Sequence, residues 1–307
     1  MPQMQAYQYQ KKGLALIFLA KKFFVLKVGD RVPTVTEMIN ESELSRGTIQ
    51  AGLELMKADG AISTISKGHL GSFLVAQDQD KLLSYLDYRN VVCAMPLPYT
   101  KHYEGLGTGL YKAFKNQKLG LNVAYVNESV NRLEGLQRNR YDFIIVSALT
   151  ADYLAEHHDV DVVGIMPEGS YVSQHVIVYK GDQDFKMRDG LRIGIDSHSL
   201  DYKLMTNKIL EKHKVELVES PYNQIVQRIV AGEIDAAIWN LDEVKSKNYP
   251  LGYQMIKDPM VKRASRAAIL CAKGNGFVKR VIGDYVDFKE VTAIQKQVIS
   301  GEVLPEY

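Results

Sequence analysis

Cysteine, net charge and long hydrophobic runs are all scarce in this sequence of 307 residues. The two cysteines, Cys93 and Cys271, lie inside short apolar segments and are too few for a disulfide framework. We expect both to be small buried hydrophobic residues, and we predict a cytoplasmic protein. The apolar run at residues 14–20 is followed at once by two lysines and is far shorter than the roughly 20 residues that span a bilayer. We interpret it as part of a buried helix and expect no contact with a membrane.

Motifs for metal binding and catalysis are also missing. Among the seven histidines, His157 and His158 are adjacent and the others are isolated, which is not the spacing of a metal site. There is no Gly-x-Ser-x-Gly elbow, and the glycine-rich run at residues 105–109 lacks the spacing of a nucleotide-binding loop. Carboxylates such as Glu104 or Asp196 have the chemistry of a general base, but nothing else indicates catalysis. The sequence therefore predicts no metal, no cofactor and no enzymatic activity.

The composition favours a globular protein with a basic N-terminal part. Hydrophobic residues make up 46% and charged residues 24%, which suits two or three packing units. The formal net charge is only +2. However, residues 1–75 contain nine Lys or Arg against six Asp or Glu, and the rest of the chain is close to neutral. This distribution is typical of a nucleic-acid-binding head on a neutral body.

The first 75 residues show the order of a winged helix. We predict a well-buried helix over residues 9–26, then a short second helix that starts at a Thr34–Glu37 capping box. A third helix begins with Ser45 as N-cap. Its apolar positions form one stripe: Ile49, Gly52, Leu53 and Met56. Two β-prone segments, residues 61–65 and 72–75, follow and are joined by turn-forming residues, which predicts a hairpin.

Several short motifs in this region resemble the winged-helix head of GntR-type regulators. They are Val32-Pro33-Thr34, Ser45-Arg46-Gly47-Thr48-Ile49, Ala58-Asp59-Gly60 and Gly68-His69-Leu70-Gly71-Ser72-Phe73. Ser42, Glu43 and Gln50 depart from the leucine, turn glycine and second arginine that are usual in that family. The resemblance implies a winged-helix fold and binding to double-stranded DNA, but not the family's usual operator sequence.

The third helix and the hairpin carry the polar side chains that DNA contact requires. Arg46 can donate two hydrogen bonds to guanine and Gln50 can pair with adenine, whereas hydroxyls and N–H groups at the helix start can hold phosphates. The predicted DNA-binding residues are Thr34, Ser45, Arg46, Thr48, Gln50, Lys67 and His69. The alternative is that they are ordinary solvated residues of a winged helix used only for dimerisation.

We predict a winged-helix domain over residues 1–75, a linker over residues 76–88 and a two-lobed sensor domain over residues 89–307. In the third part, strands alternate with helices, which indicates an α/β fold. The expected strands are residues 90–95, 121–126, 141–147, 160–166, 172–180, 191–196, 215–218, 234–239 and 267–272. The expected helices are residues 105–115, 129–137, 200–212, 223–230, 277–287 and 290–300.

A weak internal repeat organises this α/β region. Five residues match five others at a constant offset of 93, including Asp142 with Asp235, and both copies suggest a helix, a turn and a strand. Two such lobes, with crossing strands near residues 176–179 and 267–272, resemble the type 2 periplasmic-binding-protein fold that LysR-type regulators use as a sensor. Taken whole, the chain resembles the YhfZ family of GntR-like regulators. The resemblance implies a sensor domain, without identifying its effector.

In such lobes, ligands bind beyond the carboxyl ends of strands, where helices begin. The side chains expected there are Tyr99, Thr100, Ser147, Ser197, His198, Ser199 and Asn240. None carries a fixed charge at neutral pH, and the hydroxyls and N–H groups of residues 197–199 suit a carboxylate or phosphate. We therefore expect a small anionic effector in a cleft between the lobes. The alternative for residues 197–199 is a plain serine N-cap, and the alternative for Ser147 and Asn240 is that they are loop polar groups satisfied locally.

Together these features predict a ligand-responsive bacterial transcriptional regulator. We expect a homodimer, because one small winged head offers little contact for strong operator affinity. The alternative is a cytoplasmic metabolite-binding protein or enzyme on a periplasmic-binding-protein fold, with the winged helix used only for dimerisation.

Overall fold

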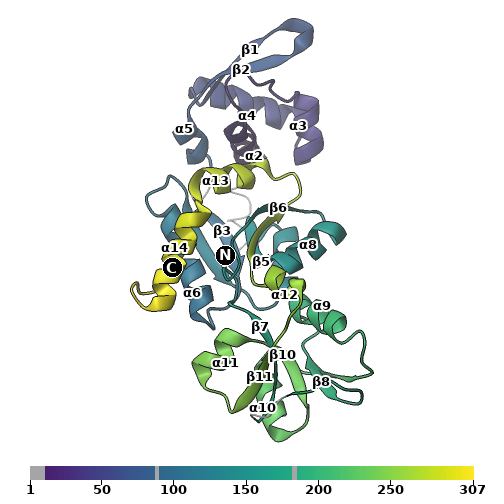
Figure 1. Cartoon of the computed structure of the whole chain (residues 1–307). Helices are drawn as coiled ribbons and strands as arrows, with labels where there is room; N and C mark the ends of the chain where they lie inside the picture. Colours follow the sequence, from purple (N-terminus) through teal and green to yellow (C-terminus); the bar gives the residue numbers. More distant parts are fainter. Residues whose placement is uncertain (1–10, 87–89, 182–184) are drawn as a thin grey trace, which may run out of the picture. The chain divides into compact units, whose positions relative to one another are not determined.

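The structure, a computed structural model, describes residues 11–86, 90–181 and 185–307, and the chain divides into two compact units (Figure 1). One unit contains the residues before 91 with two short later segments, residues 116–120 and 276–281. The other contains most of the α/β elements.

The described part of the first unit begins with three helices and a hairpin. They are α2 (Lys11–Val25), α3 (Val35–Ser42), α4 (Arg46–Ala58), β1 (Ile62–Ser66) and β2 (Ser72–Gln77). The predicted capping box is confirmed: the Thr34 hydroxyl accepts from the N–H of Glu37, whose carboxylate accepts from the N–H of Thr34. A Cβ at Gly52 would lie 2.8 Å from Leu19, so this glycine lets α4 pack closely on α2.

The strands β1 and β2 pair antiparallel, from Ile62 with Gln77 to Ser66 with Ser72, and extend from the helices as a wing (Figure 1). The predicted linker, residues 76–88, includes the end of β2 and a helix, α5 (Gln79–Ser84). Asp78 caps that helix, and its Leu82 and Leu83 are buried. Much of this segment is therefore packed structure.

The α/β region consists of two lobes, each built on one five-stranded sheet. The first sheet has the order β4-β3-β5-β12-β6, with β4 (Gly120–Tyr125), β3 (Asn90–Met95), β5 (Phe143–Ser147), β12 (Ala267–Ala272) and β6 (Val160–Ile165). The second has the order β11-β7-β10-β8-β9, with β11 (Leu251–Met255), β7 (His175–Lys180), β10 (Ala236–Asn240), β8 (Arg192–Ile195) and β9 (Glu216–Glu219). The chain crosses between the sheets twice, through residues 166–174 and 256–266.

Helices accompany both sheets. The first lobe has α6 (Lys101–Phe114), α7 (Ser129–Gln137), α8 (Ala148–His157), α12 (Pro259–Ala264) and α14 (Phe288–Ser300), and α13 (Gly276–Tyr285) is divided between the two units at residue 281. The second has α9 (Leu200–Ile209), η2 (Tyr222–Gln224), α10 (Ile225–Ala231) and α11 (Leu241–Lys247). All nine strands and six helices expected in this region occur within a few residues of their predicted bounds, whereas β11, α8, α11 and α12 were not predicted.

The internal repeat has a structural counterpart in the two lobes. The carboxylate of Asp142 accepts from the N–H of Val92 at 2.8 Å, and that of Asp235 accepts from the N–H of Arg192 at 2.7 Å. Each aspartate thus ties the start of one strand to its parallel neighbour. Ser147 and Asn240, at the same offset, are the N-caps of α8 and α11.

The two cysteines and the glycine-rich run at residues 105–109 have structural roles. Cys93 and Cys271 are buried thiols that form no disulfide within the described residues, and burial raises the pKa of the Cys93 thiol far above its usual range, so it stays protonated. The glycines of residues 105–109 lie within α6, where a Cβ at Gly109 would be 2.8 Å from the carbonyl oxygen of Val291 in α14. The run serves close packing of α6 on α14.

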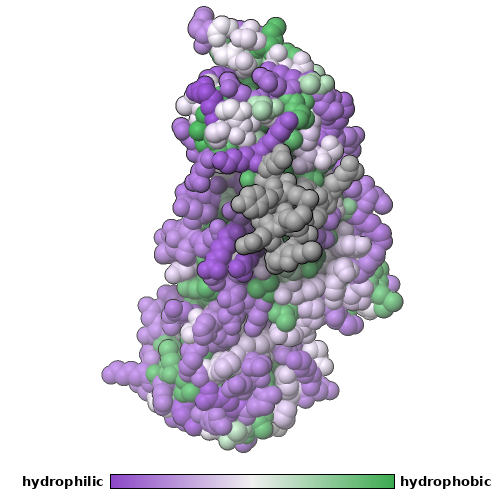
Figure 2. Space-filling model, turned by 180° about the vertical axis from the view of Figure 1, so that it is seen from behind, coloured by the Kyte–Doolittle hydropathy of each residue, from purple (hydrophilic) through white to green (hydrophobic). Residues whose placement is uncertain are grey.

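Among the residues that the structure describes, no helix is long and apolar enough to cross a bilayer. On the face shown in Figure 2, hydrophobic residues are scattered among hydrophilic ones and form no single continuous patch.

Candidate functional site

The start of α4 presents polar side chains on the face opposite its buried stripe. Ile49, Gly52 and Met56 are buried, whereas Arg46 and Gln50 are exposed. Ser45 caps the helix by accepting from the N–H of Thr48 at 3.3 Å, and its hydroxyl lies 2.7 Å from that of Thr48. This is the arrangement expected of a helix that presents its N-terminal end to DNA.

Contacts within the head orient two of the predicted DNA-binding side chains, Arg46 and Lys67. The guanidinium of Arg46 donates to the hydroxyl of Thr36 at 3.3 Å, which links α4 to α3 and orients the side chain. At the tip of the wing, Lys67 lies over the ring of Phe73 at 4.7 Å, and His69 is exposed in the short turn η1 (Gly68–Leu70). Thr34 is exposed but occupied as the cap of α3.

A cavity lies between the two lobes of the α/β region and encloses about 650 Å³ of empty space, including the part open to solvent. The first lobe contributes the loop after β3 and the start of α7, and the second contributes the start of α9 and the turn η2. Tyr171 and His175, at the first crossing between the lobes, complete the wall. The expected interlobe cleft is therefore present.

Arg132 of α7 is the most unusual residue of this cavity. Its side chain is 3% exposed, and its guanidinium donates to the carbonyl oxygen of Val126 at 2.7 Å and to the hydroxyl of Tyr171 at 3.4 Å. Among the described residues, its Nε–H and the nearby hydroxyl of Ser129 are buried without a hydrogen-bond partner. A buried guanidinium is normally paired with an anion, so Arg132 and Ser129 form a candidate anion-binding pair.

The backbone beside this pair is strained. Glu128, which precedes α7 and also lines the cavity, has a φ of 61° and a ψ of 136°. A residue with a side chain rarely adopts such angles, and backbone strain of this kind clusters at ligand-binding sites. The start of α7 is therefore a candidate position for ligand contact.

Asp201 of α9 faces the cavity from the second lobe. Its side chain is 8% exposed, and one carboxylate oxygen accepts from the hydroxyls of Ser147 and, at 2.8 Å, Thr150 at the start of α8. Burial raises the pKa of Asp201, and these hydrogen bonds oppose that rise. Because α8 belongs to the first lobe, this contact joins the lobes.

Aromatic rings form the rest of the cavity wall. Tyr222 stacks on Trp239 with ring centroids 4.0 Å apart, and Tyr202 stacks on the same indole at 5.8 Å. Tyr99 of the first lobe faces Tyr222 of the second at 6.2 Å with an angle of 15° between the rings. Tyr222 also donates to the carboxylate of Glu243. The wall suits a ligand with an apolar or planar part.

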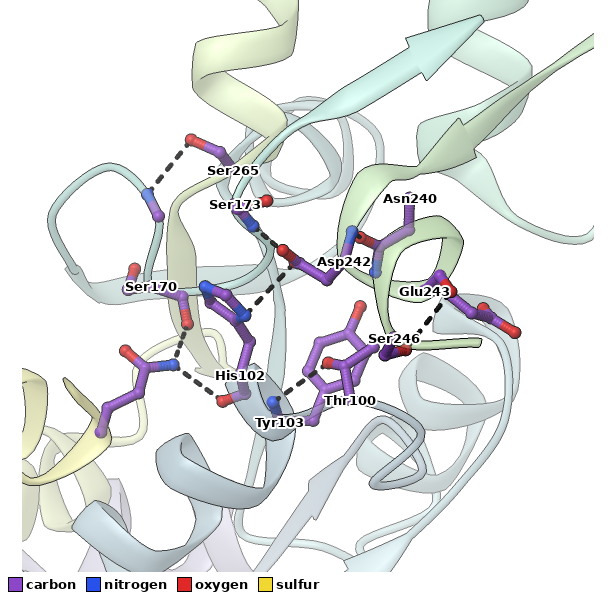
Figure 3. Close-up of polar contacts among 12 residues, drawn as sticks. Thr100, His102, Tyr103, Ser170, Ser173, Asn240, Asp242, Glu243, Ser246 and Ser265 are labelled. Carbon is purple, nitrogen blue, oxygen red and sulfur yellow. Dashed lines mark hydrogen bonds and ion pairs between the residues drawn. The ribbon is translucent and has the colours of Figure 1, made fainter. Parts of the chain in front are cut away.

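A second polar contact between the lobes lies near the crossings and is shown in Figure 3. His102 of α6 lies 3.3 Å, measured from Nδ1, from the carboxylate of Asp242 in α11, which also accepts from the N–H of Ser173 at 2.7 Å. Burial lowers the pKa of His102, and Asp242 opposes this change. Gln295 of α14 donates to the carbonyl oxygens of His102 and Ser170, so α14 supports the same region.

The seven predicted ligand-binding residues are not all in the cavity. Tyr99 and Ser199 line it, and the Ser199 hydroxyl caps no N–H of α9. Thr100, Ser147 and Asn240 are buried helix caps, so their polar groups are satisfied locally. Ser197 and His198 are exposed in a loop where Glu219 and Asp196 accept their N–H groups. Sequence reasoning missed Arg132, Ser129, Asp201 and Tyr222.

Within the described residues, one group has the composition of a metal site. Side-chain ligand atoms of Asp196, His198 and Glu219 lie within 4.8 Å of one another. Both carboxylates already accept backbone N–H groups of the same loop and of Tyr222, so these side chains have a structural role in shaping the loop.

Comparisons with known proteins agree with this architecture. Residues 27–74 match the model of a helix-turn-helix domain, and residues 78–307 match that of the YhfZ C-terminal domain. YhfZ of Escherichia coli strain K12 is 33% identical over 302 residues, covering 97% of this chain and 98% of that protein. The crystal structure of YhfZ from Shigella flexneri, also 33% identical, superposes with a TM-score of 0.64 and covers 74% of this chain and 97% of that one.

More distant structures share the fold of the α/β region. The periplasmic aliphatic sulphonate binding protein SsuA of Escherichia coli is 13% identical, with a TM-score of 0.53 over 69% of this chain and 75% of that one. The predicted fold, a winged helix-turn-helix followed by a two-lobed domain like a type 2 periplasmic binding protein, is confirmed. The chain therefore belongs to the YhfZ family.

Proposed function

We propose that this protein is a transcriptional regulator that binds operator DNA through α4 and the β1–β2 wing and responds to a small anionic molecule in the interlobe cavity. The helix-turn-helix match and the exposed polar face of α4 support the DNA half. The binding-protein fold of the α/β region and its cavity support the sensor half, and favour a binder over an enzyme.

The observation that carries the ligand half is the buried guanidinium of Arg132. Its hydrogen bonds go to two neutral oxygens, and its Nε–H has no partner. Removing a charge from water costs several kcal/mol unless an opposite charge compensates, so a carboxylate, phosphate or sulfonate would supply the missing partner. The proposed anion contact therefore lies at Arg132 and Ser129, and Ser199 is the one hydroxyl of the predicted 197–199 site retained as a contact.

Binding to DNA as a dimer is part of the same proposal. Arg46 and Gln50 are proposed to contact bases, Ser45, Thr48 and Thr34 phosphates, and Lys67 and His69 the backbone beside the wing. Two copies would contact two half-sites, and closure of the sensor around its ligand would change the spacing of the two heads.

The DNA half is tested by footprinting the full-length protein across DNA of its source organism. We expect discrete protected sites that scrambled competitor DNA does not abolish. Protection no better than that on random sequence would refute the regulator and favour a metabolite-binding role.

The ligand half is tested by thermal-shift measurements with carboxylated, phosphorylated and sulfonated metabolites. A ligand at 100 times its dissociation constant adds about 2.7 kcal/mol of stability. This stabilisation should vanish in Arg132→Met while DNA binding persists. A hit that the variant still binds would place the anion elsewhere.

A further inference from the structure

Two buried ionisable groups, one basic and one acidic, line the cavity, one from each lobe. Arg132 belongs to α7 of the first lobe and Asp201 to α9 of the second. Their side chains are 3% and 8% exposed, respectively. Arg132 donates to a carbonyl and a phenol, and the side chains that donate to Asp201 are two hydroxyls, so within the described part of the chain neither has an ionic partner.

The two groups are near enough to influence each other electrostatically but do not form a salt bridge. The positive charge of Arg132 acts to lower the pKa of Asp201, against the larger effect of burial. The Oδ1 atom of Asp201 accepts from the hydroxyls of Ser147 and Thr150, whereas its Oδ2 accepts from no side chain of the described residues. Among the described residues, Nε of Arg132 is therefore buried without a hydrogen-bond partner, and Oδ2 of Asp201 lies on a residue that lines the same cavity and accepts from none of their side chains.

A ligand with only an anionic group would satisfy Arg132 but leave Asp201 buried without a cation. The aromatic wall points the same way, because the faces of Tyr99, Tyr202 and Tyr222 carry negative electrostatic potential and attract a cation. Burial raises the pKa of Tyr202 and of Tyr222, so both rings stay neutral.

We infer that the effector is a small zwitterion that bridges the two lobes, with its anionic group on Arg132 and Ser129 and its ammonium group on Oδ2 of Asp201. The anionic contact rests on the proposed function, and the cationic contact is the new element. Since each charge comes from a different lobe, only a molecule with both groups at the right separation contacts both lobes ionically.

The test measures binding of matched triplets of compounds to the full-length protein. The panel contains the common amino acids and glycine betaine, together with the deaminated carboxylate and the decarboxylated amine of each. Dissociation constants come from the fluorescence of Trp239, which is the only tryptophan and stacks on Tyr222. We expect at least one zwitterion to bind about tenfold to hundredfold more tightly than either of its half-molecules, as loss of a charged hydrogen bond predicts.

Asp201→Asn supplies the decisive variant, because the amide oxygen can still accept from Ser147 and Thr150. In this variant the zwitterion and its deaminated carboxylate should bind equally well. Asp196→Asn is the matched control, since Asp196 lines the same cavity but its carboxylate accepts the N–H groups of His198 and Tyr222. The control should keep the wild-type preference.

Each other outcome contradicts a distinct part of the reasoning. If deaminated carboxylates bind as tightly as zwitterions, or if Asp201→Asn keeps the preference, the zwitterion is refuted and the proposed function stands. If only amines bind, or if no compound of the panel binds, the anionic site is refuted as well, and with it the sensor half of the proposed function.

Discussion

Replacing Arg132 by methionine separates a ligand-binding role from a structural one, because the two roles predict different changes in stability. Methionine is unbranched and fills most of the same space, but it removes the charge and every donor. Two hydrogen bonds are lost, to Val126 at 2.7 Å and to Tyr171 at 3.4 Å. The second is long, so the loss amounts to about 1.5–3 kcal/mol for one good charged hydrogen bond.

The substitution also removes the cost of keeping an unpaired guanidinium out of water, which is several kcal/mol even after relaxation. Methionine also gains about 1.5–3 kcal/mol from burying its apolar side chain. We therefore expect Arg132→Met to leave the free energy of unfolding of the ligand-free protein within about 1 kcal/mol of wild type, or to raise it. Ligand binding should be lost.

Urea unfolding followed by Trp239 fluorescence measures the effect, with the slope of the transition as a check that the unfolded surface is unchanged. Arg138→Met is the matched control, because Arg138 ends the same helix and forms an exposed pair with Glu134. It should change neither stability nor ligand binding. A loss of about 3–5 kcal/mol in Arg132→Met would mean that the arginine completes a structural ion pair, and would refute the reasoning.

Three further predictions concern the remaining parts of the molecule. Arg46→Ala should weaken specific DNA binding roughly tenfold or more and relax the base preference. Lys67→Ala should weaken specific and non-specific binding alike, and it should reduce the slope of log affinity against log salt concentration by about one. Equal behaviour of both variants on specific and scrambled DNA would show that the roles are misassigned. Burial lowers the pKa of His175 to about 4, so the folded state stays neutral while the unfolded state gains a proton near pH 6.5. The contribution of His175 to the free energy of unfolding is therefore complete above pH 6.5 and falls by up to about 3 kcal/mol as the pH drops to 4. His175→Gln should remove this loss, which urea unfolding at pH 7 and pH 5 measures. Gly109→Ala would place a methyl group 2.8 Å from the carbonyl oxygen of Val291. The substitution should cost about 1–3 kcal/mol of stability and so lower the melting temperature. An unchanged melting temperature would show that α6 and α14 are less tightly packed.

The sequence predicted elements wherever hydrophobic periodicity and capping residues were strong. The capping box at Thr34, the N-cap at Ser45 and the helix at residues 129–137 all occur as expected. β11 was missed because it is an edge strand in which Tyr253 and Met255 are exposed, so it lacks a buried apolar pattern. The helix α8 was missed although its cap, Ser147, was noted, because that serine was interpreted as a ligand contact.

Arg132 illustrates why the sequence did not reveal the site. It lies beside Leu133, in a helix that periodicity identified correctly, but nothing in the sequence distinguishes it from Arg138, which is exposed. Arginine on a helix is usually solvated, so its burial depends on how the start of α7 meets Tyr171 and the carbonyl of Val126. Tertiary packing sets that environment, and sequence periodicity carries no information about it.

The position of the cavity residues follows from how the helix starts are satisfied. Polar residues that directly follow a strand, such as Ser147 and Asn240, are needed to cap α8 and α11, so their polar atoms are used within the protein. Except for Ser199, whose hydroxyl caps no N–H of α9, the groups proposed to contact a ligand therefore come from within the helices and not from their caps. Arg132, in the first turn of α7, and Asp201, in the first turn of α9, occupy such positions. Because Asp201 also accepts from the cap of α8, a ligand that binds it acts on the same residue that joins the two lobes, which provides a direct route from ligand binding to lobe movement.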